Sequence, residues 1–204
     1  MCNGFEQEIA YRAYVAAMEL VGLGVPTVQT ELDLPPREHV HIRDDAAVVR
    51  AAGNGVELAL MRFGFPPAHP RGGVVFNFRA EGRRFASSNR CLIPASAFFE
   101  YTGAKSPKDR HRFTAHAEPF FCIAGLWRTA ADGGAPNFTM LTVEPGPDVA
   151  PYHDRQIVVL PKESWGAWLS LSKPESDLLT ASPAGTFDVL TEPGGRARQA
   201  SLLP

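Results

Sequence analysis

The second residue of the sequence MCNGF is a cysteine, and its place near the end of the chain gives it two possible nucleophiles. Removal of Met1 would leave Cys2 with a free α-amine on the same carbon frame as its thiol. A terminal amine has an ordinary pKa of about 7.7 to 8.0, so it is partly neutral near pH 7 and can form a Schiff base with an aldehyde. The alternative is an incidental cysteine at a ragged terminus. The rest of the sequence decides between a reactive and an incidental Cys2.

Three further stretches carry polar side chains in otherwise apolar surroundings. They are FNFRAEG with Asn77, AFFEY with Glu100, and APYHDRQIVVLP with His153. An ionised carboxylate in an aromatic run is costly to bury, unless Glu100 points outward from a strand. Burial would favour its neutral form and make Glu100 a proton donor near neutral pH. His153 is a second proton-transfer candidate, with a hydrogen-bonded structural histidine as its alternative.

The remaining cysteines and the hydropathy pattern narrow the class of protein. Cys91 and Cys122 lie in apolar runs typical of buried thiols, and an odd number of cysteines without ligand spacing predicts neither disulfides nor a metal site. The sequence has no apolar run of about eighteen residues and no basic segment leading into an apolar one, so we expect no membrane span and no signal peptide. A cytoplasmic protein without cofactors fits best.

The charges of the chain are unevenly distributed. The formal net charge is −2, but residues 62–90 carry +5 and the rest of the chain −7. The six arginines of this run are Arg62, Arg71, Arg79, Arg83, Arg84 and Arg90, and phenylalanines are interleaved with them. A solvated basic face explains this pattern, and so does a groove for the phosphates and unstacked bases of a single strand.

Apolar periodicity and turn residues predict one strand-rich α+β domain over residues 1–204. Helices are predicted over residues 6–21 and 162–171. Strands are predicted within residues 39–43, 46–51, 56–65, 73–80, 90–101, 111–117, 119–128, 137–143 and 155–161. The tail from about residue 172 is rich in Pro, Gly and Ser and is expected to wrap the surface.

Four motifs occur in an order that resembles one protein family. MCNGF is similar to Met-Cys-Gly-Arg-Phe, FNFRAE to Asn-Ala-Arg-x-Glu, RCLIPASAFFEY to Arg-Cys-Leu-Ile-Pro followed by Glu-Trp, and LTVEPGPDVAPYHDRQIVVL to Leu-Thr-Thr-Glu-Ala-Asn followed by His-Asp-Arg-Met-Pro-Val. The chain thus resembles the SOS-response-associated peptidase family of abasic-site processing proteins, which crosslink to single-stranded DNA through an N-terminal cysteine. The resemblance extends over nearly the whole chain and favours a functional Cys2.

The resemblance implies a barrel-like core of mixed and antiparallel strands flanked by helices, and it implies a role for each matching residue. Cys2 is the expected nucleophile, Asn77 and Glu100 are its neighbours, His153 is the proton-transfer partner, and Arg79, Arg155, Thr142 and Phe63 are DNA contacts. The sequence departs from the family pattern at Gly4 (arginine), Phe63 (tryptophan), Tyr101 (tryptophan) and Gln156-Ile157 (Met-Pro). None of these changes removes a reacting group, but they bear on how tightly DNA is held.

The expected reaction is covalent capture of an abasic site in single-stranded DNA. The open abasic sugar is an aldehyde, the Cys2 amine would form an imine with it, and the thiol would close a thiazolidine ring. Peptidase activity would be limited to release of Met1. Two alternatives stay open: a single-stranded DNA-binding module with weakened chemistry, and a cysteine hydrolase that uses Cys2, His153 and Glu100. We expect a monomer that associates with the nucleoid during repair.

Overall fold

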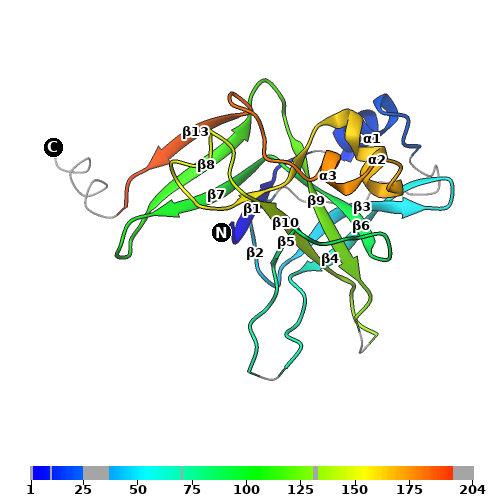
Figure 1. Cartoon of the computed structure of the whole chain (residues 1–204), viewed down its shortest axis with the longest axis horizontal. Coiled ribbons are helices and arrows are strands. Elements are labelled where there is room, and N and C mark those ends of the chain that lie inside the picture. Colours follow the sequence, from blue (N-terminus) through cyan, green and yellow to red (C-terminus); the bar gives the residue numbers. More distant parts are fainter. Residues whose placement is uncertain (1, 10, 25–36, 70, 131–132, 195–204) are drawn as a thin grey trace.

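Two β-sheets make up most of the computed structural model of the protein, which describes residues 2–9, 11–24, 37–69, 71–130 and 133–194. The first sheet has the strand order β13-β8-β7-β1-β2 and is antiparallel in all its pairings. Its strands are β1 (Gly4–Gln7), β2 (Arg37–His41), β7 (Ala97–Thr102), β8 (Asp109–Ala115) and β13 (Phe187–Glu192). In Figure 1, β7, β8 and β13 extend away from the rest of the molecule.

The second sheet contains both parallel and antiparallel pairs. Its strands are β3 (Asp45–Ala52), β4 (Gly55–Phe63), β5 (Asn77–Arg79), β6 (Asn89–Ala95), β9 (Phe121–Arg128), β10 (Asn137–Val143), β11 (Gln156–Ile157) and β12 (Val159–Leu160). The order is β11-β10-β4-β3-β6-β9-β12, β9 also pairs with β10, and β5 runs parallel to β10. Each strand in the series β10, β4, β3, β6 and β9 is therefore paired with the next, and the last strand, β9, is paired with the first, β10.

Alternating residues of the second sheet face two separate hydrophobic cores. On β3, Val49 packs in the core beneath the helices, whereas Val48 packs in the core shared with the first sheet. β10 divides its side chains in the same way, with Leu141 in the first core and Met140 in the second. Because successive side chains of a strand point to opposite faces, a strand buried on both sides reads as an unbroken apolar run.

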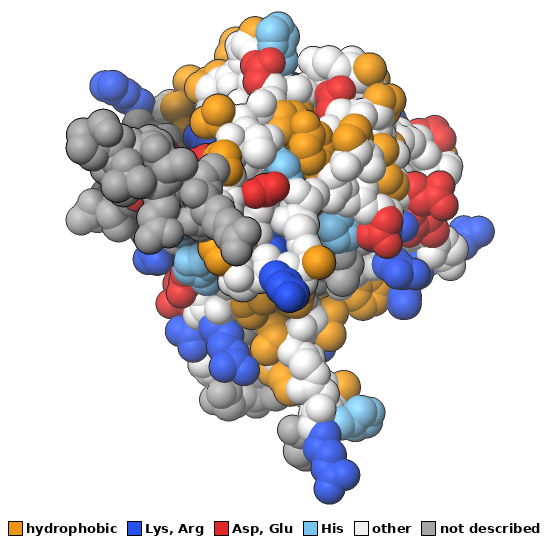
Figure 2. All heavy atoms as spheres, turned by 90° about the vertical axis from the view of Figure 1, so that its left-hand side faces the viewer, with side chains coloured by type: hydrophobic (Ala, Val, Ile, Leu, Met, Phe, Trp, Pro, Cys, Tyr) orange, Lys and Arg blue, Asp and Glu red, His pale blue; other side chains and the backbone are white. Residues whose placement is uncertain are grey.

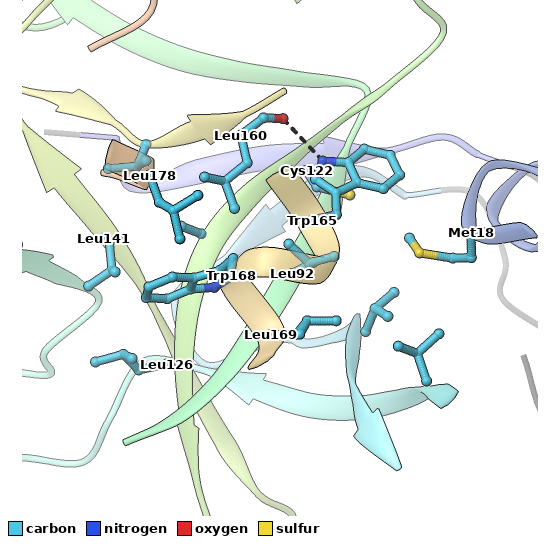
Figure 3. Packing of buried hydrophobic residues seen from close by; sticks show 14 of the residues in the cluster. Met18, Leu92, Cys122, Leu126, Leu141, Leu160, Trp165, Trp168, Leu169 and Leu178 are labelled. Carbon is cyan, nitrogen blue, oxygen red and sulfur yellow. Dashed lines mark hydrogen bonds between the residues drawn. The ribbon is translucent and has the colours of Figure 1, made fainter. Parts of the chain in front are cut away.

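Helices cover one face of the second sheet (Figure 1). They are α1 (Tyr11–Leu20), the 3₁₀ turn η1 (Lys162–Ser164), α2 (Trp165–Ser170) and α3 (Glu175–Leu178). Figure 3 shows Trp168 of α2 among leucines of the sheet and of α3, while Trp165 donates a hydrogen bond to the carbonyl of Leu160 at 3.1 Å. Each indole N–H thus has a partner, since Trp168 donates to the carbonyl of Cys91 at 3.0 Å.

The chain passes from the second sheet to the first at Ser96, and this step positions the candidate site. Ala95 still pairs with Phe121 on β9, whereas Ala97 pairs with Glu6 on β1. The N–H of Ser96 between them donates to the carbonyl of Glu6 at 2.9 Å. The run predicted as one strand over residues 90–101 is therefore two strands that belong to different sheets.

Most predicted elements are confirmed, and two predictions besides the single strand over residues 90–101 need correction. The strand-rich fold with flanking helices and the helix within residues 162–171 are confirmed. The prediction of a helix from residue 6 is wrong, because residues 4–7 form β1 and the helix begins at Tyr11. The tail from residue 172 does more than wrap the surface, because β13 pairs with β8 along its whole length and buries Phe187. In the described part of the chain, no helix is both long and apolar enough to cross a membrane.

Candidate active site

The residues just before β1 place Cys2 beside the C-terminal half of β7. β1 lies between β2 and β7, with Phe5 paired to Phe98, and the register continued toward the N-terminus brings residues 2 and 3 alongside Glu100. Phe5 is fully buried against the rings of Phe63 and Phe138, so the strand is anchored two residues after Asn3. Burial of an aromatic side chain at this position explains why the segment is a strand and not the start of a helix.

Cys2 is buried and its thiol is strongly biased toward the neutral form. Its side chain is in the core shared by the two sheets, with 1% of the residue exposed, and Sγ donates to the carbonyl of Gly4 at 3.2 Å. Burial, followed by the nearby charge of Glu100, raises the pKa of the Cys2 thiol to about 12. Near neutral pH the thiol is therefore protonated, and a base must accept its proton when sulfur attacks.

Glu100 faces the backbone nitrogen of Cys2. It is 2% exposed, and its carboxylate accepts a hydrogen bond from the Cys2 N–H. Burial is the largest cause that raises the pKa of Glu100 from 4.5 to about 7, and the negative charge of Asp154 adds to it. About half of this carboxyl is protonated at neutral pH. If Met1 is removed, the nitrogen beside Glu100 becomes the α-amine of Cys2.

Asn77 holds the other side of the Cys2 peptide. It begins β5, beside Met140 of β10, and its Nδ2 donates to the carbonyl of Cys2 at 2.7 Å. Its Oδ1 is buried, and within the described part of the chain no hydrogen bond reaches it. A buried acceptor without a partner is uncommon, so Asn77 can still accept a hydrogen bond from a bound amine or hydroxyl group.

His153 lies in the loop between β10 and β11, next to the Asp154 whose charge acts on Glu100. Its Nδ1 is 2.9 Å from both the N–H of Arg155 and the Oδ1 of Asp154, and these contacts need opposite protonation of Nδ1. Burial lowers the pKa of His153, so the neutral ring that accepts from Arg155 is the form near neutral pH. The ring proton is then on Nε2, and His153 can donate one proton there.

Arg155 is engaged within the protein. Its Nη1 and Nη2 bind the two carboxylate oxygens of Glu81 at 2.6 and 2.8 Å, and Nη2 also donates to the carbonyl of Thr142 at 2.8 Å. The hydrogen bonds from Arg155 are the largest cause that lowers the pKa of Glu81 to about 2. The predicted contact of Arg155 with DNA stays a prediction, and in this structure Glu81 and Thr142 hold its guanidinium.

Phe63 and Thr142 also lie away from solvent. Phe63 is fully buried and stacks on Phe138 with ring centroids 5.1 Å apart, while Thr142 is 2% exposed beneath the guanidinium of Arg155. The family resemblance predicted both as DNA contacts, and in this structure both side chains are buried.

The arginine-rich run has mixed roles. Arg79 is exposed on β5, and no ion pair is found for it within the described residues. Arg83 lies over the ring of Phe78 at 4.4 Å. Arg90 instead donates to four backbone carbonyls, two of them on α2, and fixes that helix to the sheet. The segment between β4 and β5, which includes the exposed Arg71, projects from the body of the molecule (Figures 1 and 2).

Sequence reasoning missed a buried histidine beside the site. His111 on β8 is paired across the strands with Glu100, and its two ring nitrogens contact the hydroxyls of Thr102 and Thr191 at 2.7 and 2.9 Å. Its ring lies 4.4 Å from that of Tyr152, the residue before His153. A period-two reading of residues 109–115 aligned with Glu100 would have found it. In the described residues, no group of three His, Cys, Asp or Glu side chains is arranged to hold a metal ion.

The fold and the site define a class of protein in which a cysteine near the N-terminus, a buried glutamate and an asparagine meet between two β-sheets. The family model described as SOS response associated peptidase (SRAP) matches residues 1–190. The chain belongs to this family, which confirms the resemblance drawn from its motifs.

Relatives in sequence agree with this assignment, and solved structures share the fold. The chain is 29% identical to the abasic site processing protein YobE of Bacillus subtilis (strain 168) over 143 residues, which are 62% of this chain and 65% of YobE. It is 30% identical to the abasic site processing protein YoaM of the same organism over 142 residues, which are 62% of this chain and 63% of YoaM. A phage-related protein from Bordetella bronchiseptica has the same fold, with a TM-score of 0.70, 20% identity, and 94% of each chain covered. A protein from Bacteroides thetaiotaomicron gives a TM-score of 0.67 at 19% identity, with 93% of this chain and 91% of that chain covered.

Proposed function

We propose that the protein processes abasic sites in single-stranded DNA by forming a covalent crosslink through Cys2. The observation that carries this proposal is the hydrogen bond from the Cys2 nitrogen to Glu100, a buried carboxyl with a pKa of about 7. The family and the names of its Bacillus relatives support the choice of an abasic site as the substrate. An abasic nucleotide has no base to unpair or unstack, so its entry into the site costs little.

The first step joins the amine of Cys2 to the aldehyde of the open sugar. After release of Met1, the neutral amine adds to the aldehyde carbon and gives a carbinolamine. Protonated Glu100 donates its proton to the leaving hydroxyl, water departs, and a protonated imine forms while Glu100 is left ionised. Asn77 holds the Cys2 carbonyl at 2.7 Å, so the amine has one orientation relative to Glu100.

The second step consumes the thiol. Sγ of Cys2 bonds to the carbon of the protonated imine, the ionised Glu100 takes the thiol proton, and the electron pair of the C=N bond returns to the nitrogen, which keeps its proton. The product is a five-membered thiazolidine, and it contains no imine that could promote β-elimination of the strand. Because the pKa of the thiol is about 12, the amine attacks before the sulfur.

The same pKa argues against the cysteine hydrolase alternative. A hydrolase needs a thiolate, which forms near neutral pH only when the thiol pKa is lowered by a cation or a helix N-terminus. Burial beside Glu100 does the opposite to Cys2. The alternative of a DNA-binding module without chemistry is separated from our proposal by experiment.

The test compares wild type with Cys2→Ala on an oligonucleotide whose single uracil has been excised. Wild type is expected to give an adduct that survives denaturing electrophoresis, whereas Cys2→Ala keeps the amine and should give an adduct only when borohydride reduces the imine. Cys2→Ser is the matched control, because it keeps the size of the side chain but not the stable sulfur ring. Equal yields of unreduced adduct from wild type and Cys2→Ala would show that the nucleophile is assigned wrongly.

A further inference from the structure

One carboxylate holds both ends of the loop that carries His153. This loop, residues 144–155, joins β10 to β11. At its start, the N–H of Glu144 donates to Oε1 of Glu81 at 2.9 Å. At its end, the guanidinium of Arg155 donates to the two carboxylate oxygens of Glu81 at 2.6 and 2.8 Å. Glu81 therefore closes the loop at its base.

Glu81 also follows the strand that contacts Cys2. It lies in the turn after β5, four residues beyond Asn77, whose Nδ2 donates to the carbonyl of Cys2. The turn is fixed to β10, because the N–H of Ala80 donates to the carbonyl of Thr142 at 2.9 Å. The strand that contacts Cys2 and the loop after β10 are thus joined through Glu81.

Arg155 transmits this contact to the ring of His153. Only 11% of the Arg155 side chain is exposed, and its Nε is buried without a hydrogen-bond partner in the described part of the chain. A buried guanidinium that lost its carboxylate would be an unpaired charge, which is costly, so the side chain would turn toward solvent. The backbone N–H of Arg155, which donates to Nδ1 of His153 at 2.9 Å, would be displaced with it.

That N–H competes with Asp154 for Nδ1 of His153. Oδ1 of Asp154 is also 2.9 Å from Nδ1, but a carboxylate requires a proton on this nitrogen, whereas the N–H of Arg155 requires a lone pair there. While the N–H is in place, the ring proton of neutral His153 is on Nε2. Without it, Asp154 would favour the proton on Nδ1, and Nε2 would have no proton with which to donate.

The body of the loop is held by contacts that do not involve Glu81. Asp148 accepts hydrogen bonds from two backbone N–H groups, one before and one at the start of β13, at 3.0 Å each. The ring of Tyr152 packs on the ring of His111 with centroids 4.4 Å apart. Loss of Glu81 is therefore expected to change the end of the loop and to leave the rest of it in place.

We propose that Glu81 is a positioning residue for His153, and that it keeps the ring proton on Nε2 by holding Arg155. The inference rests on the proposed function, because it takes His153 to assist reversal of the adduct with a hydrogen bond donated by Nε2. Glu81 takes no part in the reaction at the sugar. Its loss should therefore affect reversal of the adduct and not its formation.

The imidazole nitrogens of His153 report the predicted effect without any DNA. Nitrogen NMR of isotopically labelled protein, at a pH where the ring is neutral, should find the proton on Nε2 in wild type and mainly on Nδ1 in Glu81→Ala. Glu192→Ala is the matched control, because it removes the carboxylate of another bidentate ion pair, that with Arg110, and should leave the ring as in wild type. An unchanged tautomer in Glu81→Ala overturns the inference.

Exchange of preformed adduct, in a chase with unlabelled abasic DNA, connects the ring to the reaction. Glu81→Ala should slow exchange about fivefold, as for one lost hydrogen bond, while it forms adduct at nearly the wild-type rate. Glu81→Gln keeps an oxygen that can accept from the N–H of Glu144, so its exchange rate should lie between those of wild type and Glu81→Ala. In the His153→Ala background, Glu81→Ala should have no further effect.

The other outcomes of these experiments count against the inference. An exchange rate in Glu81→Ala equal to that of wild type removes Glu81 from reversal. Equal slowing of formation and exchange, in Glu81→Ala and Glu192→Ala alike, would indicate a general loss of stability. An effect of Glu81→Ala that persists in the His153→Ala background would mean that Glu81 acts on another group. If wild type itself forms no adduct, the proposed function fails, while the tautomer of His153 still tests the role of Glu81.

Discussion

Replacement of Glu100 by glutamine changes one property of the site and leaves its shape in place. The glutamine Oε1 can still accept the hydrogen bond from the Cys2 nitrogen, but the side chain no longer carries an exchangeable proton near neutral pH. Dehydration of the carbinolamine needs that proton. We expect adduct formation at pH 7 to slow by about 100-fold, the low end for loss of a general acid–base group, which corresponds to about 2.7 kcal/mol in the barrier.

The pH dependence gives a sharper signature than the rate alone. The amine must be neutral, so the rate rises with pH through the range in which a terminal amine ordinarily loses its proton, near pH 8. Glu100 must be protonated, and because its pKa is about 7 the protonated fraction falls above that pH. The product of the two fractions gives wild type a bell-shaped profile whose alkaline limb descends. Glu100→Gln lacks the second factor, so its slower rate should rise with pH and then stay level.

Single-turnover crosslinking to an abasic oligonucleotide, with protein in excess and pH varied from about 5.5 to 9.5, measures both effects. Aliquots stopped in denaturant and separated by electrophoresis give the rate at each pH. Glu100→Asp is a useful companion, because it keeps the carboxyl but shortens the side chain by one methylene. A Glu100→Gln protein that crosslinks at the wild-type rate, or that keeps the descending alkaline limb, would refute the role assigned to Glu100.

The other predictions concern Glu100 in stability, His153 in reversal and Arg79 in binding. Folding raises the pKa of Glu100 from 4.5 to about 7, so its contribution to the stability of the fold is fully present below pH 4.5 and is lost as the pH rises to about 7. Urea titrations should therefore show the free energy of unfolding of wild type, relative to that of Glu100→Gln, falling by roughly 3 kcal/mol over that interval. A difference that stays constant with pH contradicts this. His153→Ala should form adduct at nearly the wild-type rate but exchange it more slowly in a chase with unlabelled abasic DNA, and exchange as fast as wild type removes His153 from reversal. Arg79→Ala should lower the salt slope for single strands by about 0.7 while Arg12→Ala on α1 does not, and equal slopes take Arg79 out of the groove.

The sequence indicated which polar residues gather around Cys2, but it did not indicate which of the predicted DNA contacts are buried. Asn77 and Glu100 stand in motifs whose residue types match a chemical task, and the structure brings both to the backbone of Cys2. Phe63 and Thr142 were assigned from the same resemblance, but burial cannot be read from residue type when a strand is covered on both faces. An arginine such as Arg155 gives no sign in the sequence that a carboxylate 74 residues away will hold it.

The fold shows the same division between local and long-range information. The helix at residues 165–170 ends at Leu171 in a left-handed conformation and was found from its apolar spacing. The helix expected from residue 6 competed with pairing of β1 to two other strands, and that pairing depends on segments near residues 40 and 98. Likewise, the break at Ser96 is set by which sheet each neighbour joins, so an unbroken apolar run could not reveal it.

The mass of the intact protein–DNA adduct tests the central claim most directly. Our account predicts the mass of the chain without Met1 plus that of the abasic oligonucleotide, less one water, with the sugar attached at Cys2 after digestion of the adduct. The loss of one water follows from the balance of the two steps, because ring closure adds the thiol to the imine without releasing anything further. An adduct that retains Met1, or one attached at a lysine or at another cysteine, would contradict the account.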